Sequence, residues 1–193
     1  MAEPRPEAVL VRHGETEWSR TGKHTGRTDI PLSDAGRRNA EVLRASLSAR
    51  PFARVLTSPL SRAAETCRLA GLGASAETRD ELLEWDYGDY EGLTTPEIRE
   101  RRPDWSLWRD GCPGGEAPED VAARVDRLIA EVRQVDGDVA LFAHGHVLRV
   151  LAARWIELGP EWGARLVLAT ATLGVLGWEH ETAAIRLWNA PPS

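Results

Sequence analysis

Histidine and arginine side chains stand directly after three short apolar runs of the 193-residue sequence. The three segments are Arg12-His13-Gly14 after residues 8–11, Ser58-Pro59 with Arg62 after residues 54–57, and His144-Gly145-His146 after residues 139–143. A neutral imidazole is a competent nucleophile toward phosphorus, and guanidinium groups bind phosphate oxygens through several N–H donors. Two histidines and two arginines brought to one place would therefore suit chemistry on a phosphoryl group.

The elements that would position these side chains alternate between strand and helix. The apolar runs indicate buried strands, and residues 173–178 and 184–188 indicate two closing strands joined by a polar turn. Helical patterns run from an N-cap at Asp34 to Pro51, from Pro59 to about Ala70, through Val121, Val125, Leu128 and Val132, and through Leu148, Leu151 and Trp155. This alternation predicts an α/β fold: a three-layer α/β/α sandwich with a mostly parallel central sheet.

In a sheet of this kind, ligands bind in the crevice outside the carboxyl ends of the strands. We therefore expect the segments at His13, Arg62 and His144 to converge at one edge of the sheet. No internal repeat, linker or second core interrupts the pattern. Residues 1–193 are accordingly predicted to form a single domain.

The middle of the chain, residues 81–116, is rich in Trp, Asp, Gly and Pro and lacks a long periodic pattern. A short helix is predicted to begin at Pro96, with Thr94 or Thr95 as its cap. Four residues of this segment have two interpretations: Arg101, Arg102, Trp105 and Trp108. They could form a lid that selects the substrate, in which the arginines bind a second phosphate. They could instead provide aromatic packing for an irregular subdomain. The sequence leaves these two interpretations open.

Charge and cysteine content exclude several classes of protein. The net charge of −6 and the isoelectric point near 5.4 argue against nucleic-acid binding, which needs a basic face. Cys67 and Cys112 are too few for a disulfide framework. The first ten residues lack the apolar run of a signal peptide, and the longest uncharged stretch, residues 166–178, is too short to cross a bilayer. We expect a cytoplasmic protein without membrane or nucleic-acid partners.

The segment Arg12-His13-Gly14-Glu15-Thr16 resembles the phosphohistidine motif of the histidine phosphatase superfamily, in the branch that includes cofactor-dependent phosphoglycerate mutases. Four further segments resemble the family in the same order: residues 25–33, Thr57-Ser58-Pro59 with Arg62, residues 84–92, and residues 143–146. Together they span nearly the whole chain. A lone Arg-His-Gly is a weak signal, whereas four more segments in order are specific. The resemblance implies the phosphoglycerate mutase-like version of the predicted sandwich.

The resemblance also implies catalytic roles. His13 would be the nucleophile that becomes phosphorylated, with its other ring nitrogen oriented by a backbone carbonyl. Arg12 and Arg62 would hold the phosphate oxygens and, by their charge, favour the neutral histidine. His144 would be a second donor to the phosphoryl oxygens. Glu84 would protonate the leaving oxygen and then remove a proton from the attacking water.

A second set of residues is implied to lie near the substrate: Ser19, Thr25, Gly26, Tyr87, Gly145 and Arg149. Many relatives carry asparagine at position 19 and glutamine at position 25, so the shorter hydroxyl side chains here change the fine geometry. Gly26 permits close approach of a backbone N–H to phosphate, although it also suits a simple turn. Core packing for Tyr87 and a surface salt bridge for Arg149 are the competing interpretations.

Other polar residues receive plainer interpretations. Three acids share the stretch of Glu84 and compete with it for the acid role: Glu81, Asp86 and Glu91. His146 is interpreted as a packing residue, and His24 and His180 as surface residues. Because no third ligand stands at a useful spacing from His144 and His146, we predict neither a metal ion nor another cofactor.

The implied activity is hydrolysis of a small phosphorylated substrate. The chain resembles sedoheptulose-bisphosphatase-like enzymes and actinobacterial acid phosphatases in residues 16–19, 84–92 and 108–112. A phosphoglycerate mutase is the alternative, although mutases carry a longer insertion after the acid and a longer C-terminal tail that shield the phosphohistidine from water. A non-catalytic phospholigand-binding module would be expected to lose His13 or Glu84, and neither is lost. The physiological substrate and a homodimer stay open.

Overall fold

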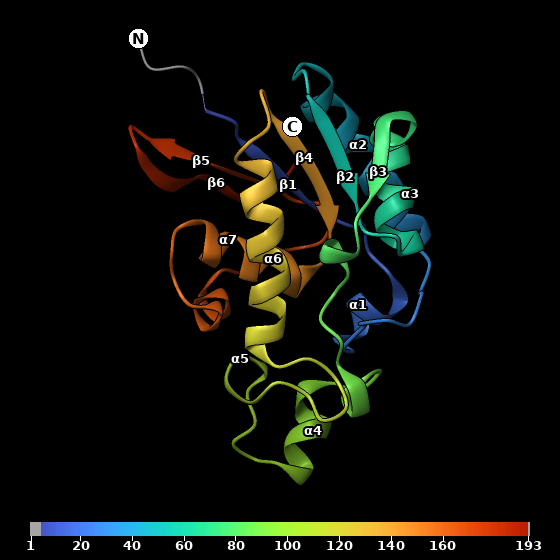
Figure 1. Cartoon of the computed structure of the whole chain (residues 1–193). Helices are drawn as coiled ribbons and strands as arrows, with labels where there is room; N and C mark the ends of the chain where they lie inside the picture. Colours follow the sequence, from blue (N-terminus) through green and yellow to red (C-terminus); the bar gives the residue numbers. More distant parts are fainter. Residues whose placement is uncertain (1–4, 193) are drawn as a thin grey trace.

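The computed structural model describes residues 5–192, and its centre is a six-stranded sheet (Figure 1). In sequence the strands are β1 Ala8–Arg12, β2 Arg54–Thr57, β3 Ala76–Thr78, β4 Val139–Ala143, β5 Leu173–Glu179 and β6 Thr182–Ala190. Across the sheet they lie in the order β3-β2-β4-β1-β5-β6. Strands β3, β2, β4 and β1 run parallel, whereas β5 runs antiparallel to β1 and to β6. The predicted α/β fold with a mostly parallel sheet is confirmed.

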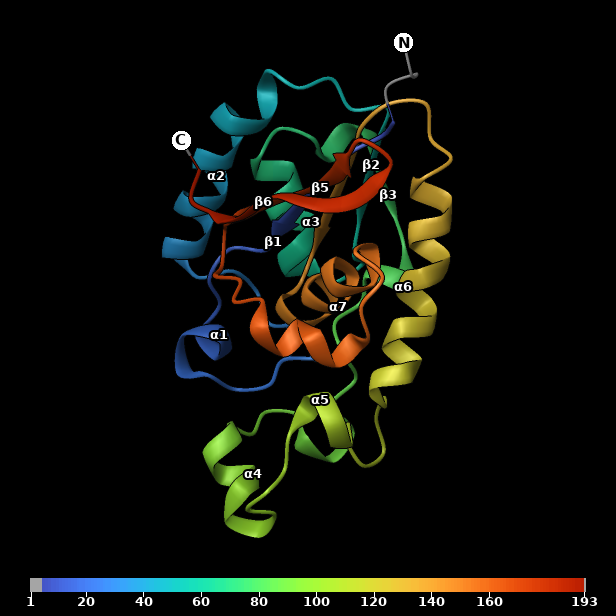
Figure 2. The same ribbon diagram turned by 90° about the vertical axis from the view of Figure 1, so that its left-hand side faces the viewer.

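Helices cover both faces of the sheet (Figures 1 and 2). Helices α2 Asp34–Ser48 and α3 Ser61–Leu69 lie on one face, and α6 Pro118–Val132 and α7 Gly145–Trp155 lie on the other. Successive side chains of a strand point to opposite faces. Leu10 therefore packs in the core under α6 and α7, while Val9 and Val11 pack in the core under α2 and α3. Burial on both faces explains why the strands read as continuous apolar runs.

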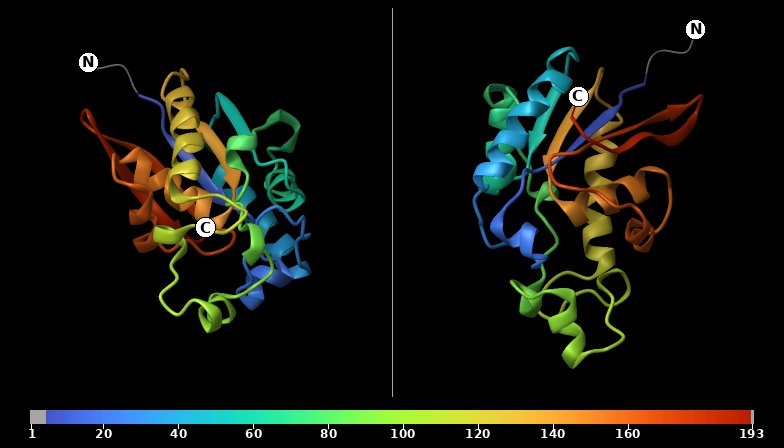
Figure 3. Two further views of the ribbon diagram at one scale, coloured as in Figure 1. Left: turned by 60° about the horizontal axis from the view of Figure 1, so that its bottom comes forward. Right: turned by 180° about the vertical axis from the view of Figure 1, so that it is seen from behind.

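Three short helices complete the outline: α1 Glu17–Thr21, α4 Thr95–Arg101 and α5 Leu107–Asp110. Helices α4 and α5 belong to a segment that projects beyond the sheet, at the bottom of Figure 1 and in both views of Figure 3. Thr94 caps α4 and Pro96 lies in its first turn, as predicted. Within residues 5–192, no helix has both the length and the apolar character needed to span a membrane.

The sequence misplaced two helix starts and missed several short elements. Ser33, rather than Asp34, is the N-cap of α2, because the Ser33 hydroxyl accepts the Gly36 N–H at 3.0 Å. Helix α3 begins at Ser61, two residues after Pro59. Helices α1 and α5 and strand β3 have five residues or fewer, which is too short to show a period.

Candidate active site

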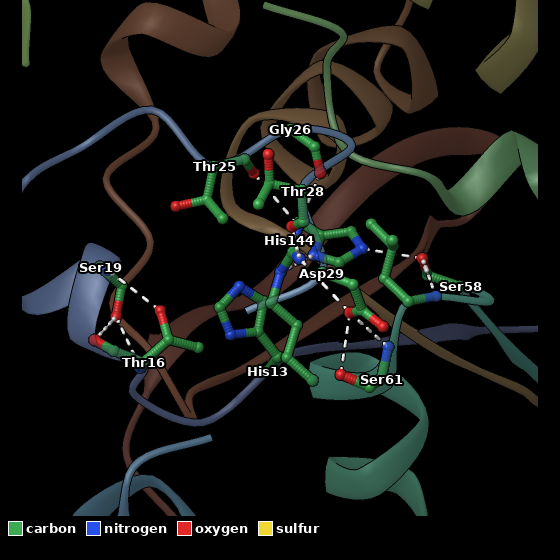
Figure 4. Close-up of polar contacts among 12 residues, drawn as sticks. His13, Thr16, Ser19, Thr25, Gly26, Thr28, Asp29, Ser58, Ser61 and His144 are labelled. Carbon is green, nitrogen blue, oxygen red and sulfur yellow. Dashed lines mark hydrogen bonds and ion pairs between the residues drawn. The ribbon is translucent and has the colours of Figure 1, made fainter. Parts of the chain in front are cut away.

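Strands β1, β2 and β4 end at the same edge of the sheet, and the polar residues that follow them meet there (Figure 4). His13 follows β1, Ser58 follows β2 and His144 follows β4. The His13 and His144 rings meet edge to face, with their centroids 5.2 Å apart. A cavity of about 220 Å³ lies at this edge, and its lining includes Arg12, His13 and Glu84. The three segments therefore converge as the strand pattern predicts.

The His13 ring is oriented by the backbone next to it. Nδ1 of His13 lies 2.6 Å from the carbonyl oxygen of Gly14. Since a carbonyl only accepts, Nδ1 carries the proton, and Nε2 of the neutral ring keeps its lone pair. Burial, reinforced by the charges of Arg12 and Arg62, holds the pKa of His13 well below its usual value of 6.5. The ring is therefore neutral and has one nucleophilic nitrogen.

Close packing of two glycines fixes the loop that carries His13. The N–H of Gly14 donates to Oγ1 of Thr66 in α3 at 3.0 Å. A Cβ atom on Gly14 would lie 2.4 Å from the Gly36 carbonyl oxygen, and one on Gly36 would lie 2.1 Å from that of Glu15. Glycine at both positions lets the first turn of α2 press against the turn after β1. This contact sets the place of the Gly14 carbonyl and, through it, the His13 ring.

Arg12 brings a buried positive charge to the cavity. Its Nη1 donates to the Leu168 carbonyl, and its Nε is buried without a hydrogen-bond partner in residues 5–192. Gly145 leaves room for the guanidinium, because a Cβ atom there would lie 3.2 Å from Cζ of Arg12. Burial lowers the pKa of Arg12, yet a guanidinium stays charged in proteins. A buried cation that lines the cavity and has no salt bridge within residues 5–192 favours an anionic ligand there.

Arg62 is fully buried and bonds to the protein around it. Its Nε donates to Nδ1 of His144 at 3.1 Å. Its Nη atoms donate to the carbonyls of Thr25, Gly26 and Thr28 at 2.9–3.1 Å. Most of its N–H donors are thereby used, so this geometry does not support the expectation that Arg62 grips phosphate oxygens directly. Arg62 instead fixes a loop and the His144 ring.

Both ring nitrogens of His144 have protein partners. Because Nδ1 accepts from Arg62, Nε2 carries the proton and donates to Oγ of Ser58 at 2.8 Å. Burial, with the charge of Arg62, holds the pKa of His144 well below 6.5. The neutral ring supports His13 through their edge contact. To act as the expected donor to a phosphoryl group, His144 would have to give up its contact with Ser58.

The loop around Gly26 is tied to a carboxylate. Glu91 accepts the N–H of Gly26 at 2.9 and 3.1 Å and the N–H of Thr28 at 3.0 Å. The Gly26 N–H that we expected to face phosphate is therefore used by Glu91, and Gly26 does not line the cavity. Thr25 does line it, but the Thr25 hydroxyl donates to the Lys23 carbonyl at 3.2 Å.

Ser19 lines the cavity with a hydroxyl that is already engaged (Figure 4). Its Oγ accepts the Thr16 N–H at 2.9 Å and donates to the Thr16 carbonyl at 3.0 Å, within the capping box of α1. A hydroxyl carries a single proton. Ser19 in this arrangement therefore has no proton left to donate to a phosphate oxygen.

Glu84 is held at the first turn of α7. Its Oε1 accepts the N–H groups of Trp85 and Val147 at 2.9 Å, and its Oε2 accepts the N–H of His146 at 3.0 Å. The N-terminus of a helix favours a negative group in this position. Glu84 is 4% exposed and lines the same cavity as His13. Of the four acids that compete for the acid role, Glu84 alone lines the cavity.

Aromatic rings form another part of the cavity wall. Tyr87 is buried, and its hydroxyl lies 2.5 Å from Nδ1 of His146. His24 packs edge-on against Tyr87, with centroids 4.8 Å apart, and it also lines the cavity. The interpretation of His24 as a surface residue is wrong, because the segment around Leu93 folds over it and accepts its Nδ1–H at 2.8 Å. His180 is exposed as expected.

Arg149 lines the cavity and is held by its own neighbours. Its Nε donates to the Gly163 carbonyl at 2.9 Å, and its guanidinium lies over the Trp108 ring at 4.6 Å from the centroid. Burial lowers its pKa from the usual value. Among the described residues no carboxylate pairs with Arg149, so the surface salt bridge is not its role. Lys23 and Thr95 also line the cavity, and the sequence indicated neither as a site residue.

The irregular middle segment supplies packing to the site. Trp105 is 2% exposed, and its indole N–H donates to the Gly111 carbonyl at 2.9 Å. Trp108 packs edge-on against Trp85. Arg101 and Arg102 are exposed and do not line the cavity. These positions favour the packing interpretation over a lid with a second phosphate site at the two arginines.

No cluster of three or more His, Cys, Asp or Glu side chains within residues 5–192 is arranged to hold a metal ion. The two histidines considered for such a pair have other contacts. His144 bonds to Arg62 and Ser58, while His146 bonds to Tyr87.

Known proteins are similar to this chain in both sequence and fold. An acid phosphatase from Mycobacterium tuberculosis is 43% identical over 176 residues, which cover 89% of this chain and 86% of that protein. Sedoheptulose 1,7-bisphosphatase from Saccharomyces cerevisiae is 39% identical over 188 residues, covering 81% and 69%. A solved structure of an open reading frame from Mycobacterium tuberculosis matches with a TM-score of 0.92 and 39% identity, covering 97% and 99%. Phosphoglycerate mutases that depend on 2,3-bisphosphoglycerate match at 31–37% identity.

The match to a family extends over nearly the whole chain. Residues 8–191 fit the model of branch 1 of the histidine phosphatase superfamily. The mostly parallel sheet with helices on both faces is the fold that the sequence resemblance implied. The chain belongs to branch 1 of the histidine phosphatase superfamily.

Proposed function

We propose that the chain, a phosphoric monoester hydrolase by its family, hydrolyses small phosphomonoesters without a metal ion through a phosphohistidine at His13. One observation carries the proposal. Within residues 5–192, the buried, neutral His13 keeps an unpaired Nε2 in a cavity that it shares with Arg12, a buried cation without a salt bridge. A nucleophile beside an unsatisfied cation is suited to attack on a phosphoryl group. Similarity to a sedoheptulose bisphosphatase supports sugar phosphates as the substrate class.

In this mechanism, Nε2 of His13 forms a bond to phosphorus while the bond from phosphorus to the ester oxygen breaks. Glu84 gives a proton to the leaving oxygen and then takes one from the water that attacks the phosphohistidine. Water breaks the phosphorus–nitrogen bond, so inorganic phosphate leaves and His13 is restored. Arg12 stabilises the charge on the phosphoryl oxygens, while Arg62 and His144 keep the surrounding loop and the His13 ring in place.

A phosphoglycerate mutase is the second candidate, because such mutases are among the relatives of this chain. Both reactions begin with transfer of a phosphoryl group to His13. They differ in whether water or a hydroxyl of a phosphorylated sugar acid attacks the intermediate. The higher identity to two phosphatases, 43% and 39%, supports hydrolysis.

The test is an assay of the purified chain with a chelator present, beside a His13→Ala variant. The substrates are sugar phosphates, 3-phosphoglycerate and an aryl phosphate. Phosphate release that survives chelation and depends on His13 would support the proposal. Interconversion of 3- and 2-phosphoglycerate without phosphate release would identify a mutase. Binding of phosphate esters without either reaction would identify a phospholigand-binding module.

We also infer that residues 1–193 form one domain and that the protein acts in the cytoplasm, while the choice between a monomer and a homodimer stays open. A single sheet with helices on both faces supports one domain, while residues 1–4 and 193 lie outside the part that the structure describes. Light scattering on the purified chain distinguishes a monomer from a homodimer, and fractionation of cells tests the location.

A further inference from the structure

Two histidines of the cavity wall take no part in the mechanism above. His24 comes from the loop after α1, and His146 comes from the first turn of α7. Both line the cavity that contains His13. Their rings lie parallel to within 8°, with centroids 6.2 Å apart. The fold thus places two imidazoles side by side in the wall of the cavity, in addition to the reacting histidine.

The partner of each ring sets which nitrogen carries the proton. The Leu93 carbonyl, 2.8 Å from Nδ1 of His24, only accepts, so Nδ1 is protonated and Nε2 of His24 is an acceptor. The Tyr87 hydroxyl lies 2.5 Å from Nδ1 of His146 and has no other acceptor in residues 5–192. Burial raises the pKa of Tyr87, so the hydroxyl keeps its proton and donates it to Nδ1. Nε2 of His146 therefore carries the ring proton and is a donor.

Both rings are neutral, and both of their Nε2 atoms are available to a ligand. Burial lowers the pKa of His24, and burial with the charge of Arg149 holds that of His146 well below 6.5. In the described part of the chain, neither Nε2 atom has a hydrogen-bond partner. Neither atom is buried, so both are accessible to a ligand in the cavity. The wall therefore presents a neutral acceptor beside a neutral donor.

This pair matches a hydroxyl group better than it matches an ion. A hydroxyl both donates and accepts, so it satisfies a neutral acceptor and a neutral donor together. An anion would instead be held by the charged side chains of the cavity, Arg12, Lys23 and Arg149, and not by these two neutral rings. We propose that Nε2 of His24 and Nε2–H of His146 bind hydroxyl groups of the substrate's alcohol part, so that the enzyme selects polyhydroxylated phosphate esters. The proposal rests on the phosphatase function and adds the side chains that read the rest of the substrate.

The enzyme should select hydroxylated substrates because an analogue without hydroxyl groups would bind this site less well. It would cover both Nε2 atoms without replacing their hydrogen bonds to water, and unpaired polar groups of this kind oppose binding. The contacts of Nδ1 with Leu93 and Tyr87 keep each ring from turning to pair elsewhere. His24 and His146 are therefore specificity residues, and their contribution depends on the hydroxyls of the substrate.

The test crosses four variants with two substrates. Glucose 6-phosphate is compared with cyclohexylmethyl phosphate, which has a similar ring without hydroxyls. His24→Asn and His146→Asn retain a polar group near Nδ1 and remove Nε2, while His24→Gln and His146→Gln place an amide near the Nε2 position. His180→Asn is the matched control, because the His180 side chain is 88% exposed in the turn between β5 and β6.

We expect the ratio of kcat/KM for glucose 6-phosphate to that for cyclohexylmethyl phosphate to fall about tenfold in each Asn variant, as for the loss of one hydrogen bond. The ratio should recover in part in the Gln variants and stay unchanged in His180→Asn. An unchanged ratio, or an equal loss on both substrates, would overturn the hydroxyl site and leave the phosphatase proposal standing. Absence of His13-dependent phosphate release from these two substrates and also from the aryl phosphate would overturn the proposed function itself.

Discussion

Glu91 and Arg62 hold the same loop, Glu91 by its N–H groups and Arg62 by its carbonyl groups. The Glu91 carboxylate accepts the N–H groups of Gly26 and Thr28 at 2.9–3.1 Å. The Arg62 guanidinium donates to the carbonyls of Thr25, Gly26 and Thr28 over the same range of distances. Because Arg62 also bonds to the His144 ring, this loop connects a carboxylate in the irregular middle segment to the centre of the site.

Replacing Glu91 with alanine should therefore weaken catalysis although Glu91 does not line the cavity. Loss of three hydrogen bonds to a carboxylate should lower the free energy of unfolding by about 2 kcal/mol and kcat/KM by about tenfold. Urea unfolding and phosphate release measure the two effects. Glu41→Ala, at an exposed position of α2, is the control. Equal behaviour of the two variants would show that the loop does not depend on Glu91.

Arg62→Lys should be far more disruptive than its conservative chemistry suggests. A lysine ammonium cannot reach His144 and three carbonyls at once, and its charge would stay buried. We expect a loss of about 3 kcal/mol in the free energy of unfolding and a large fall in kcat. Arg68→Lys on the same helix, where the side chain is 65% exposed, should change neither. A stable and active Arg62→Lys enzyme would contradict the positioning role.

The activity should persist into acid solution. The reacting form of His13 is the neutral ring, and its pKa is well below 6.5 because of burial and the charges of Arg12 and Arg62. Protonation of His13 therefore removes activity only when the pH falls well below 6.5. A profile of kcat/KM against pH, measured on an aryl phosphate, checks this. A fall in kcat/KM centred at pH 6.5, the usual pKa of histidine, would contradict the argument that burial lowers the pKa of His13.

Stability should depend on pH in the same direction. Four histidines have folded-state pKa values below 6.5: His13, His24, His144 and His146. As the pH falls through 6.5, the unfolded chain binds protons that the folded chain does not, so the free energy of unfolding decreases. Urea unfolding between about pH 7 and about pH 5 measures this slope. His24→Asn should make this slope shallower than it is in the control His180→Asn, where the replaced side chain is exposed.

The sequence predicted those features of the fold that depend on burial. Strands 8–12 and 139–143 are covered on both faces, so their apolar runs were readable, and the order of strand and helix indicated the layered fold. Strand β3 carries exposed Glu77 and Thr78 at the sheet edge and left no such pattern. Helix α1 is held by one capping box at Thr16 and Ser19, which a search for periodicity does not detect.

The site was predicted in its residue types better than in its contacts. His13 and Glu84 both line the cavity. His13 was expected there because it follows a predicted strand, and Glu84 because its segment resembles the family. The partners of Arg62 are backbone carbonyls, which have no signature in sequence. The burial of His24 depends on a segment about seventy residues away, at Leu93, and that packing is a tertiary property.

The central claim is that His13 carries the phosphoryl group during the reaction. The direct measurement is rapid quenching of the enzyme with a sugar phosphate under alkaline conditions, followed by mass spectrometry of its peptides. We predict one transient phosphoryl group on the peptide that contains His13, at Nε2, and none in His13→Ala. A phosphoryl group on another residue, or undiminished turnover by His13→Ala, would contradict the account.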